Sequence, residues 1–187
     1  MMLQQIEEFG KYVEITGYRN ISFSKVDEFL KANRKQNSLH VEVQFFEADL
    51  IATHEHLYFA VLNALQAFHS KTNKSKSVAM ETMLYAAAQR QIQKAIDKIG
   101  VRPETKAMAV VVVGSSPKCV EAMIKELTSC VGSEPDDSVL KLTKPKQQKI
   151  KETFQISAEQ LKTQPVTTEE ALVNLVIEDV ALLSTQL

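Results

Sequence analysis

The chain contains little of the chemistry that most often marks an enzyme or a secreted protein. Its 187 residues include two cysteines, five glycines, five prolines and no tryptophan. Cys119 and Cys130 are too far apart for a CxxC redox motif, and no further Cys or His completes a zinc set. A disulfide between them is one alternative, but two incidental thiols in a reduced compartment are the favoured interpretation.

Long apolar runs and a strong excess of one charge are also missing. No stretch approaches the ~20 apolar residues that span a bilayer. Residues 1–10 lack the basic and apolar regions of a signal peptide. We therefore expect a cytoplasmic protein without a membrane partner. The formal net charge of -1 excludes a chain that is basic overall, but it permits a local basic patch because steering depends on how charge is distributed.

The composition, 44% hydrophobic and 24% charged, is that of a globular protein. A chain of this length predicts a single domain over residues 1–187. Alternating apolar residues predict short strands around Val13 and Ile15 and from Leu39 to Phe45. The run from Ala107 to Val113 does not alternate, which indicates a strand covered on both faces at the sheet centre. Residues 139–142 are expected to return as one more strand.

Helical spacing and capping residues predict the other elements. The expected helices run from a cap at Ser24 to about Gln36, from a cap at Asp49 to about His69, from Ser77 to a left-handed stop at Gly100, from Pro117 to about Cys130, over about 147–152 and 158–161, and over about 168–184, where Thr167 and Glu170 have capping-box spacing. Unequal numbers of helices separate the strands. We therefore predict an α+β fold, with a small mixed or antiparallel sheet packed with several α-helices.

Candidate catalytic and metal sites are weak. His54 and His56 flank Glu55, but positions i and i+2 of a helix point about 200° apart, so the imidazoles cannot converge on one ion alone. The turn at Gly114 lacks the second glycine and the lysine of a P-loop, and no nucleophile elbow occurs. Asp136 and its neighbour are interpreted as solvated charge. We predict no catalytic residue, metal or cofactor, although a small transferase that uses the Gly114 turn is an alternative.

A basic cluster is more informative. The cations are Lys71, Lys74 and Lys76 in a loop that enters a helix at Ser77, and Arg90 and Lys94, four residues apart on one side of that predicted helix. The helix N-terminus would add attraction for a phosphate, and only Glu81 opposes these charges. This pattern predicts an RNA contact. A solvated basic surface is the alternative.

The predicted last helix is apolar around most of its circumference. Its apolar residues are Leu172, Val173, Leu175, Val176, Ile177, Val180, Leu182 and Leu183. Such a helix must be buried on more than one side. Either its own domain encloses it, or one face meets another protein.

The basic cluster also carries a family resemblance. The segment from Asn73 to Glu81, followed by Leu84-Tyr85, Arg90-Gln91-Ile92, Ala95-Ile96 and Gly100-Val101, resembles the signature of the small regulatory subunit of the KEOPS complex, the family of the PRPK-binding protein. The likeness is strongest over 73–101 and closest to archaeal members. It extends in element order from about Leu39 to Leu183, while the first 35 residues add little.

This resemblance implies an accessory subunit without its own catalysis. Such a subunit binds and regulates the small atypical kinase or ATPase of the complex. It also helps recruit tRNA through the single-stranded 3' CCA end. The complex installs threonylcarbamoyladenosine, and the chemistry belongs to an ASKHA-fold transferase subunit, an indirect partner. A stand-alone RNA-binding adaptor is the remaining alternative.

The resemblance also implies which residues act. Matching motif positions imply RNA contacts at Lys76, Ser77, Arg90 and Gln91, and charge adds Lys71, Lys74 and Lys94. The last helix is the expected kinase-docking element. Its candidate contacts are Leu172, Leu175, Val176 and Leu183. For Arg90, an ion pair with a carboxylate inside the fold is an alternative to the RNA contact.

Overall fold

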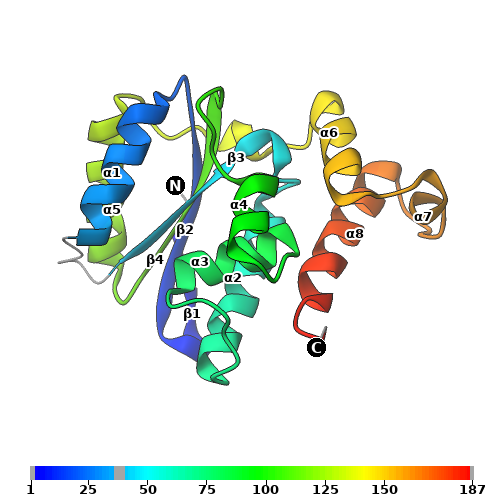
Figure 1. Cartoon of the computed structure of the whole chain (residues 1–187), viewed down its shortest axis with the longest axis horizontal. Coiled ribbons are helices and arrows are strands. Elements are labelled where there is room, and N and C mark those ends of the chain that lie inside the picture. The colour runs from blue at the N-terminus through cyan, green and yellow to red at the C-terminus, as the bar shows by residue number, and fades with distance from the viewer. Residues whose placement is uncertain (1–2, 36–40, 186–187) are drawn as a thin grey trace.

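The computed structural model describes residues 3–35 and 41–185, and its centre is a four-stranded antiparallel sheet (Figure 1). The strands are β1 (Gln4–Ile6), β2 (Lys11–Arg19), β3 (Glu42–Glu47) and β4 (Ala107–Gly114). Their order is β1-β2-β4-β3, and each neighbouring pair is antiparallel. The predicted α+β class is confirmed, and β4 lies inside the sheet as expected. Leu39 and Gln36, which the sequence placed in a strand and a helix, lie outside the described residues.

Helices cover both faces of this sheet (Figure 1). One face carries α1 (Phe23–Lys35) and α5 (Pro117–Val131). The other carries α2 (His54–His69), α3 (Val78–Ala87) and α4 (Ile92–Ile99), and beyond these lie α6 (Lys144–Phe154), α7 (Ala158–Lys162) and α8 (Thr168–Leu182). Three short 3-10 helices, η1 (Glu7–Phe9), η2 (Ala48–Leu50) and η3 (Asp137–Leu140), complete the described elements. No described helix is both long enough and apolar enough to cross a membrane.

Strand β4 explains why the core has two halves. Val111 and Val113 belong to the apolar cluster beneath α2, α3 and α8, while Val110 and Val112 belong to the cluster beneath α1 and α5. Side chains alternate across a strand, so a strand buried on both faces needs apolar residues at every position. This is why the run from Ala107 shows no alternation.

Three of the predicted helix starts were confirmed. Thr167 accepts from the N–H of Glu170, whose side chain accepts from the N–H of Thr167, and this capping box begins α8 as predicted. Ser77 likewise caps α3 through the N–H of Met80. Pro117 lies in the first turn of α5, also as predicted. These caps depend on residues three apart in sequence and are therefore readable without the fold.

Several predicted boundaries were wrong. Asp49 does not cap α2; it lies in η2 and pairs with Lys149, and α2 begins only at His54. Helix α1 begins at Phe23 and not after Ser24. Gly100 ends α4 with an extended backbone (φ -75°) and not a left-handed one. A Cβ at this glycine would lie 2.5 Å from the carbonyl oxygen of Ile96, so close approach and not handedness requires it.

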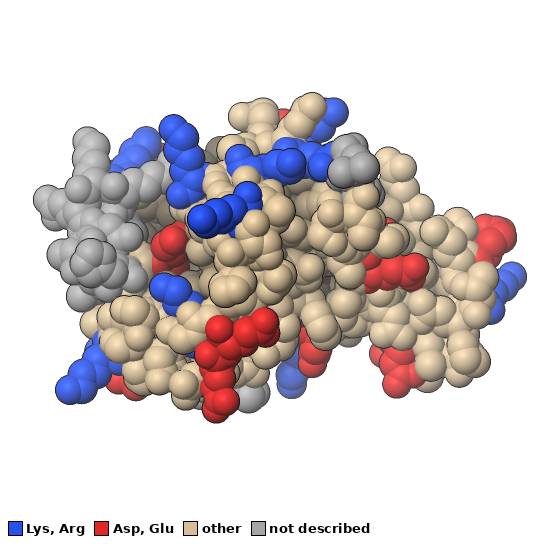
Figure 2. Space-filling model, turned by 90° about the horizontal axis from the view of Figure 1, so that it is seen from below, with Lys and Arg blue, Asp and Glu red and all other residues tan. Residues whose placement is uncertain are grey.

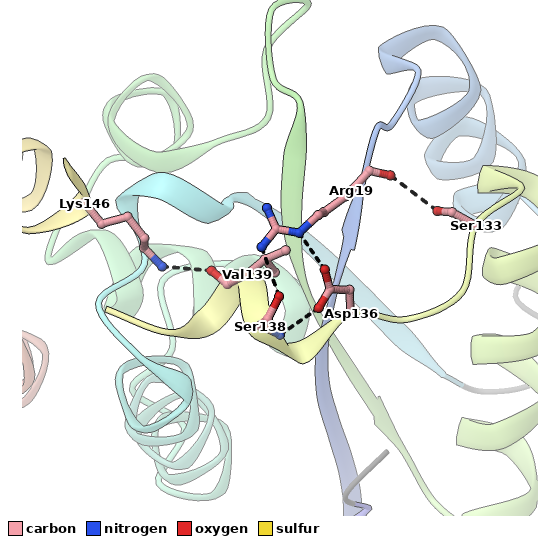
Figure 3. A network of polar contacts seen from close by, with 6 residues as sticks. All are labelled: Arg19, Ser133, Asp136, Ser138, Val139 and Lys146. Atoms are coloured by element: carbon pink, nitrogen blue, oxygen red, sulfur yellow. Dashed lines mark hydrogen bonds and ion pairs between the residues drawn. The ribbon is translucent and has the colours of Figure 1, made fainter. Parts of the chain in front are cut away.

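The strand predicted over 139–142 does not form; residues 139 and 140 instead belong to η3, which packs against β2 (Figure 3). The N–H of Asp136 donates to the carbonyl of Gly17 at 2.7 Å, and the Asp136 carboxylate pairs with Arg19 at 2.5 Å. A Cβ at Gly17 would lie 2.0 Å from Val139. Asp136 is therefore not simply solvated charge. Strand β1 pairs only with the first residues of β2. Asp136 fixes the segment that covers the rest of this edge of β2.

Candidate nucleic-acid and partner interface

The loop that carries the lysines begins with a tight stop at the end of α2. Lys71 has a left-handed backbone (φ 59°). Its N–H donates to the carbonyl of Phe68, and the N–H of Thr72 donates to that of Ala67. These two bonds form a Schellman motif, which satisfies carbonyls at the helix end. The motif turns the chain sharply into the loop over residues 71–77.

Glu81 holds this loop from within. Its carboxylate accepts from the N–H of Lys74 at 3.0 Å and from that of Ser75 at 2.7 Å. The residue is only 2% exposed. We had expected Glu81 to oppose the lysines in charge, but its carboxylate is directed at the loop backbone. Glu81 therefore fixes the conformation from which Lys74 projects.

The N-terminus of α3 is already occupied. Ser77 Oγ accepts from the N–H of Met80, and a carboxylate oxygen of Glu42 accepts from the N–H of Ala79 at 2.7 Å. These are two of the groups that we expected to attract a phosphate. Because protein side chains already accept from both N–H groups, neither is free to bind a phosphate. The predicted contribution of this helix start to phosphate binding is therefore wrong for these two groups. Any phosphate contact here must come chiefly from side chains.

The helix predicted from Ser77 to Gly100 is broken in two. Ala88 adopts a left-handed backbone (φ 49°), and the N–H of Gln89 bonds back to the carbonyl of Leu84. Arg90 therefore lies in the turn before α4, and the prediction that it shares one helix face with Lys94 was wrong. The local sequence has no glycine or proline at this break.

Two distant side chains explain the break. The last carbonyls of a helix have no partner within it. Here Nε2 of His56 lies 2.8 Å from the carbonyl oxygen of Ala86, and Nζ of Lys98 donates to that of Ala87 at 2.8 Å. The end of α3 is thus satisfied by α2 and α4. Together these bonds fix the turn over residues 88–91 that carries Arg90.

The predicted RNA cations are accessible. Lys71, Lys74, Lys76, Arg90, Gln91 and Lys94 are exposed, and Ser77 is partly buried. Within residues 3–35 and 41–185, no ion pair involves any of the five cations, so Arg90 does not pair with a described carboxylate. The α2–α3 loop lies on the lower side of Figure 1, and Figure 2 shows several Lys and Arg side chains gathered along one edge of that side.

A cavity of about 220 Å³ lies among these elements. Lys74 and Arg90 line it. The other lining residues are Thr72, Glu81, Leu84, Tyr85, Gln89, Leu183 and Ser184. The structure thus brings together two of the seven predicted RNA residues around a shared hollow. Sequence reasoning missed the largely buried side chains of Leu84 and Tyr85 here, because their helical spacing indicates only core.

A second cavity, of about 540 Å³, also borders the turn over residues 88–91, at Ala88 and Gln89. It is lined by Lys94 and Lys98, and by Asp179 of α8. Gln89 borders both cavities. Lys71, Lys76, Ser77 and Gln91 are not among the lining residues of either one. The predicted cations therefore follow the loop and the turn, and do not converge on one point.

Helix α8 turns one apolar face inward. Leu172 and Val176 are 0% exposed and Leu183 is 8% exposed, all within the core beneath α2 and α3. Leu175 is partly exposed, and Leu182 is 45% exposed. Of the four predicted docking residues, Leu172, Val176 and Leu183 are therefore buried by their own chain, and Leu175 alone is partly exposed. The helix is not wholly enclosed, because its outer side remains open.

The other candidate sites have structural roles. His56 is fully buried, and its Nδ1 accepts from the N–H of Ala52, so this imidazole is engaged on both nitrogens. In the described part of the chain, no three metal-binding side chains cluster. A Cβ at Gly114 would lie 2.8 Å from Cys119, so this turn is tightly packed. Cys119 and Cys130 are both free thiols, as the favoured interpretation held.

Comparison with known proteins gives one consistent result. The family model described as kinase binding protein CGI-121 matches residues 18–184. The regulatory protein Cgi121 of Methanocaldococcus jannaschii is 31% identical over 127 residues, which cover 67% of this chain and 79% of that relative. The EKC/KEOPS complex subunit CGI121 of Coccidioides immitis is 23% identical over 124 residues, which cover 66% of this chain and 58% of that longer relative.

Proposed function

Because the match over residues 18–184 places this chain in the CGI-121 family of kinase-binding proteins, we propose that it is a non-catalytic subunit of a KEOPS-type complex. In this role the chain, acting as one domain over residues 1–187, binds and regulates the small kinase or ATPase subunit. It also helps recruit tRNA for threonylcarbamoyladenosine modification. The transferase subunit performs the chemistry.

One observation supports the RNA part of this proposal above the others. The cavity of about 220 Å³ combines the exposed cations Lys74 and Arg90 with the apolar side chains of Leu84 and Tyr85. Proteins hold single-stranded RNA by cations that contact phosphates and by apolar or aromatic surfaces that contact unstacked bases. This combination suits the free 3' CCA end better than a base-paired stem.

The names of the relatives support the partner part. The family is described as kinase binding, one relative is named a regulatory protein, and another is named a subunit of the EKC/KEOPS complex. On this chain, the open side of α8 offers the surface for the kinase. Its exposed or partly exposed apolar residues include Leu175 and Leu182.

The test of the RNA role compares intact tRNA with tRNA that lacks its CCA end. We expect the shortened tRNA to bind the wild-type chain more weakly, by filter binding or fluorescence anisotropy. Arg90→Glu should weaken the binding of intact tRNA about tenfold or more, because a favourable contact with a phosphate becomes a repulsion. Lys125→Glu is the matched control, since Lys125 is an exposed lysine of α5 on the opposite face of the sheet. Equal affinity for the two tRNAs would overturn the CCA assignment.

A further inference from the structure

The cavity that contains Lys74 and Arg90 has a wall that no predicted RNA residue accounts for. This wall is Leu183 and Ser184, at the end of α8. Its other sides come from the lysine loop, from α3 and from the turn over residues 88–91. More than ninety residues of chain separate Arg90 from Leu183. The hollow therefore exists only because α8 packs back against the region of α3.

The two wall residues differ in chemistry. Leu183 is 8% exposed and belongs to the apolar cluster that includes Leu84 and Tyr85. Ser184 is exposed, and its hydroxyl donates to the carbonyl of Ala181 at 2.8 Å. The hydroxyl oxygen keeps lone pairs for a further donor. The wall thus presents an apolar surface below and a polar group at the rim.

The same helix also borders the neighbouring cavity. Asp179, four residues before Leu183, lines the cavity of about 540 Å³. Residues four apart lie on one side of a helix. One side of α8 therefore runs past both cavities that flank the turn of Arg90.

We propose that the end of α8 is part of the RNA site, with Leu183 against the base and Ser184 against the sugar of a terminal unpaired nucleotide. This inference rests on the proposed function. Lys74 and Arg90 supply the phosphate contacts across the cavity. Helix α8 then contributes to both partners, with its inner edge to the RNA and its outer side to the kinase.

The experiment places one negative charge at the rim of the cavity and, in a separate variant, one away from it. Ser184→Glu brings a carboxylate to the rim beside Lys74 and Arg90, and should weaken binding of a CCA-ended RNA about tenfold. Val166→Glu adds the same charge just before α8 begins. Val166 is 45% exposed and does not line the cavity. Its variant should stay within about twofold of wild type, because solvent and salt screen the added charge. Thermal melts verify that both variants fold.

The possible outcomes distinguish a failure of this inference from a failure of the proposed RNA-binding function. If Arg90→Glu weakens RNA binding while Ser184→Glu does not, α8 is no part of the site and the proposed function stands. Equal weakening by Ser184→Glu and Val166→Glu would show a long-range effect of charge, and it also overturns the inference. If Arg90→Glu has no effect either, the RNA site itself is refuted.

Discussion

His56 and Ala86 are joined by a hydrogen bond of 2.8 Å between imidazole Nε2 and a carbonyl oxygen at the end of α3. Since Nδ1 of the same ring accepts from the N–H of Ala52, the neutral ring carries its proton on Nε2 and donates it. One buried imidazole thus ties the start of α2 to the end of α3. The turn that carries Arg90 begins two residues later.

This arrangement makes stability depend on pH. Burial lowers the pKa of His56 to about 4; nearby Lys98 and Lys146 act in the same direction, and the bond to Ala86 opposes them. An unfolded chain protonates this histidine near pH 6.5, while the folded chain resists until about pH 4. The stabilisation is therefore complete above about pH 6.5 and is lost as the pH falls toward about 4. Linkage puts the full loss at about 3 kcal/mol.

Urea unfolding at pH 7 and at pH 4.5 measures this loss. His56→Gln supplies the comparison, because an uncharged amide can donate to Ala86 and does not titrate. The variant should lose less unfolding free energy than wild type between the two pH values. Parallel losses in both proteins would contradict the assigned role of His56.

The same contact shows where sequence reasoning reached its limit. The starts of α8 and α5 depend on residues close by in the sequence. Thr167 and Pro117 were therefore sufficient to predict where these helices begin. The break at Ala88 depends on His56 and Lys98, which are distant in sequence or on the next helix. No local signal encodes such a partner, so an uninterrupted helix was the natural expectation.

The site was predictable to a similar degree. Its cations could be found from sequence, because charge clustered in a loop is a local property. Its walls could not, because the cavity needs Leu183 brought beside Arg90. Likewise, Glu81 reads as one opposing charge until its bonds to Lys74 and Ser75 are visible. Apolar spacing also predicted that α8 is buried, without indicating which side stays open.

A substitution of Glu81 tests whether this residue affects RNA affinity through its charge or through the loop conformation that it stabilises. Removing a carboxylate beside the proposed RNA site should strengthen RNA binding if only net charge mattered. We expect Glu81→Gln to weaken RNA binding, because the loop loses charge-assisted bonds at Lys74 and Ser75. Stability should fall by about 1 to 2 kcal/mol. Thermal melts and RNA titrations measure both effects.

The control for Glu81 is Glu126→Gln. Glu126 is an exposed acid on α5, and this change alters net charge equally. It should leave both stability and RNA affinity close to wild type. If Glu81→Gln bound RNA more tightly than wild type, charge would outweigh loop geometry, and the scaffold role of Glu81 would be wrong.

Salt dependence tests whether the cations contact phosphates. Each neutralised phosphate of a single strand contributes roughly -0.7 to the slope of log affinity against log salt, so four contacts predict about -3. The four are Lys74, Lys76, Arg90 and Lys94. Arg90→Gln should make the slope shallower by about 0.7, whereas Lys125→Gln should not change it. An unchanged slope for Arg90→Gln would remove its phosphate contact.

The last prediction separates docking from folding on α8. Leu182 is 45% exposed, so Leu182→Glu should abolish association with the kinase subunit while the melting temperature stays close to wild type. Leu172 is 0% exposed, so Leu172→Ala should lower stability by about 2 to 5 kcal/mol and leave docking intact at temperatures where the chain is folded. Size-exclusion chromatography with the kinase subunit measures association.

Val166 provides the matched control for that experiment. It is also 45% exposed but precedes α8, so Val166→Glu should leave association unchanged. If Leu182→Glu bound the kinase as wild type does, the outer side of α8 would not be the docking surface. Loss of association in both variants would instead mean that an added negative charge, and not the apolar side of α8, decides docking.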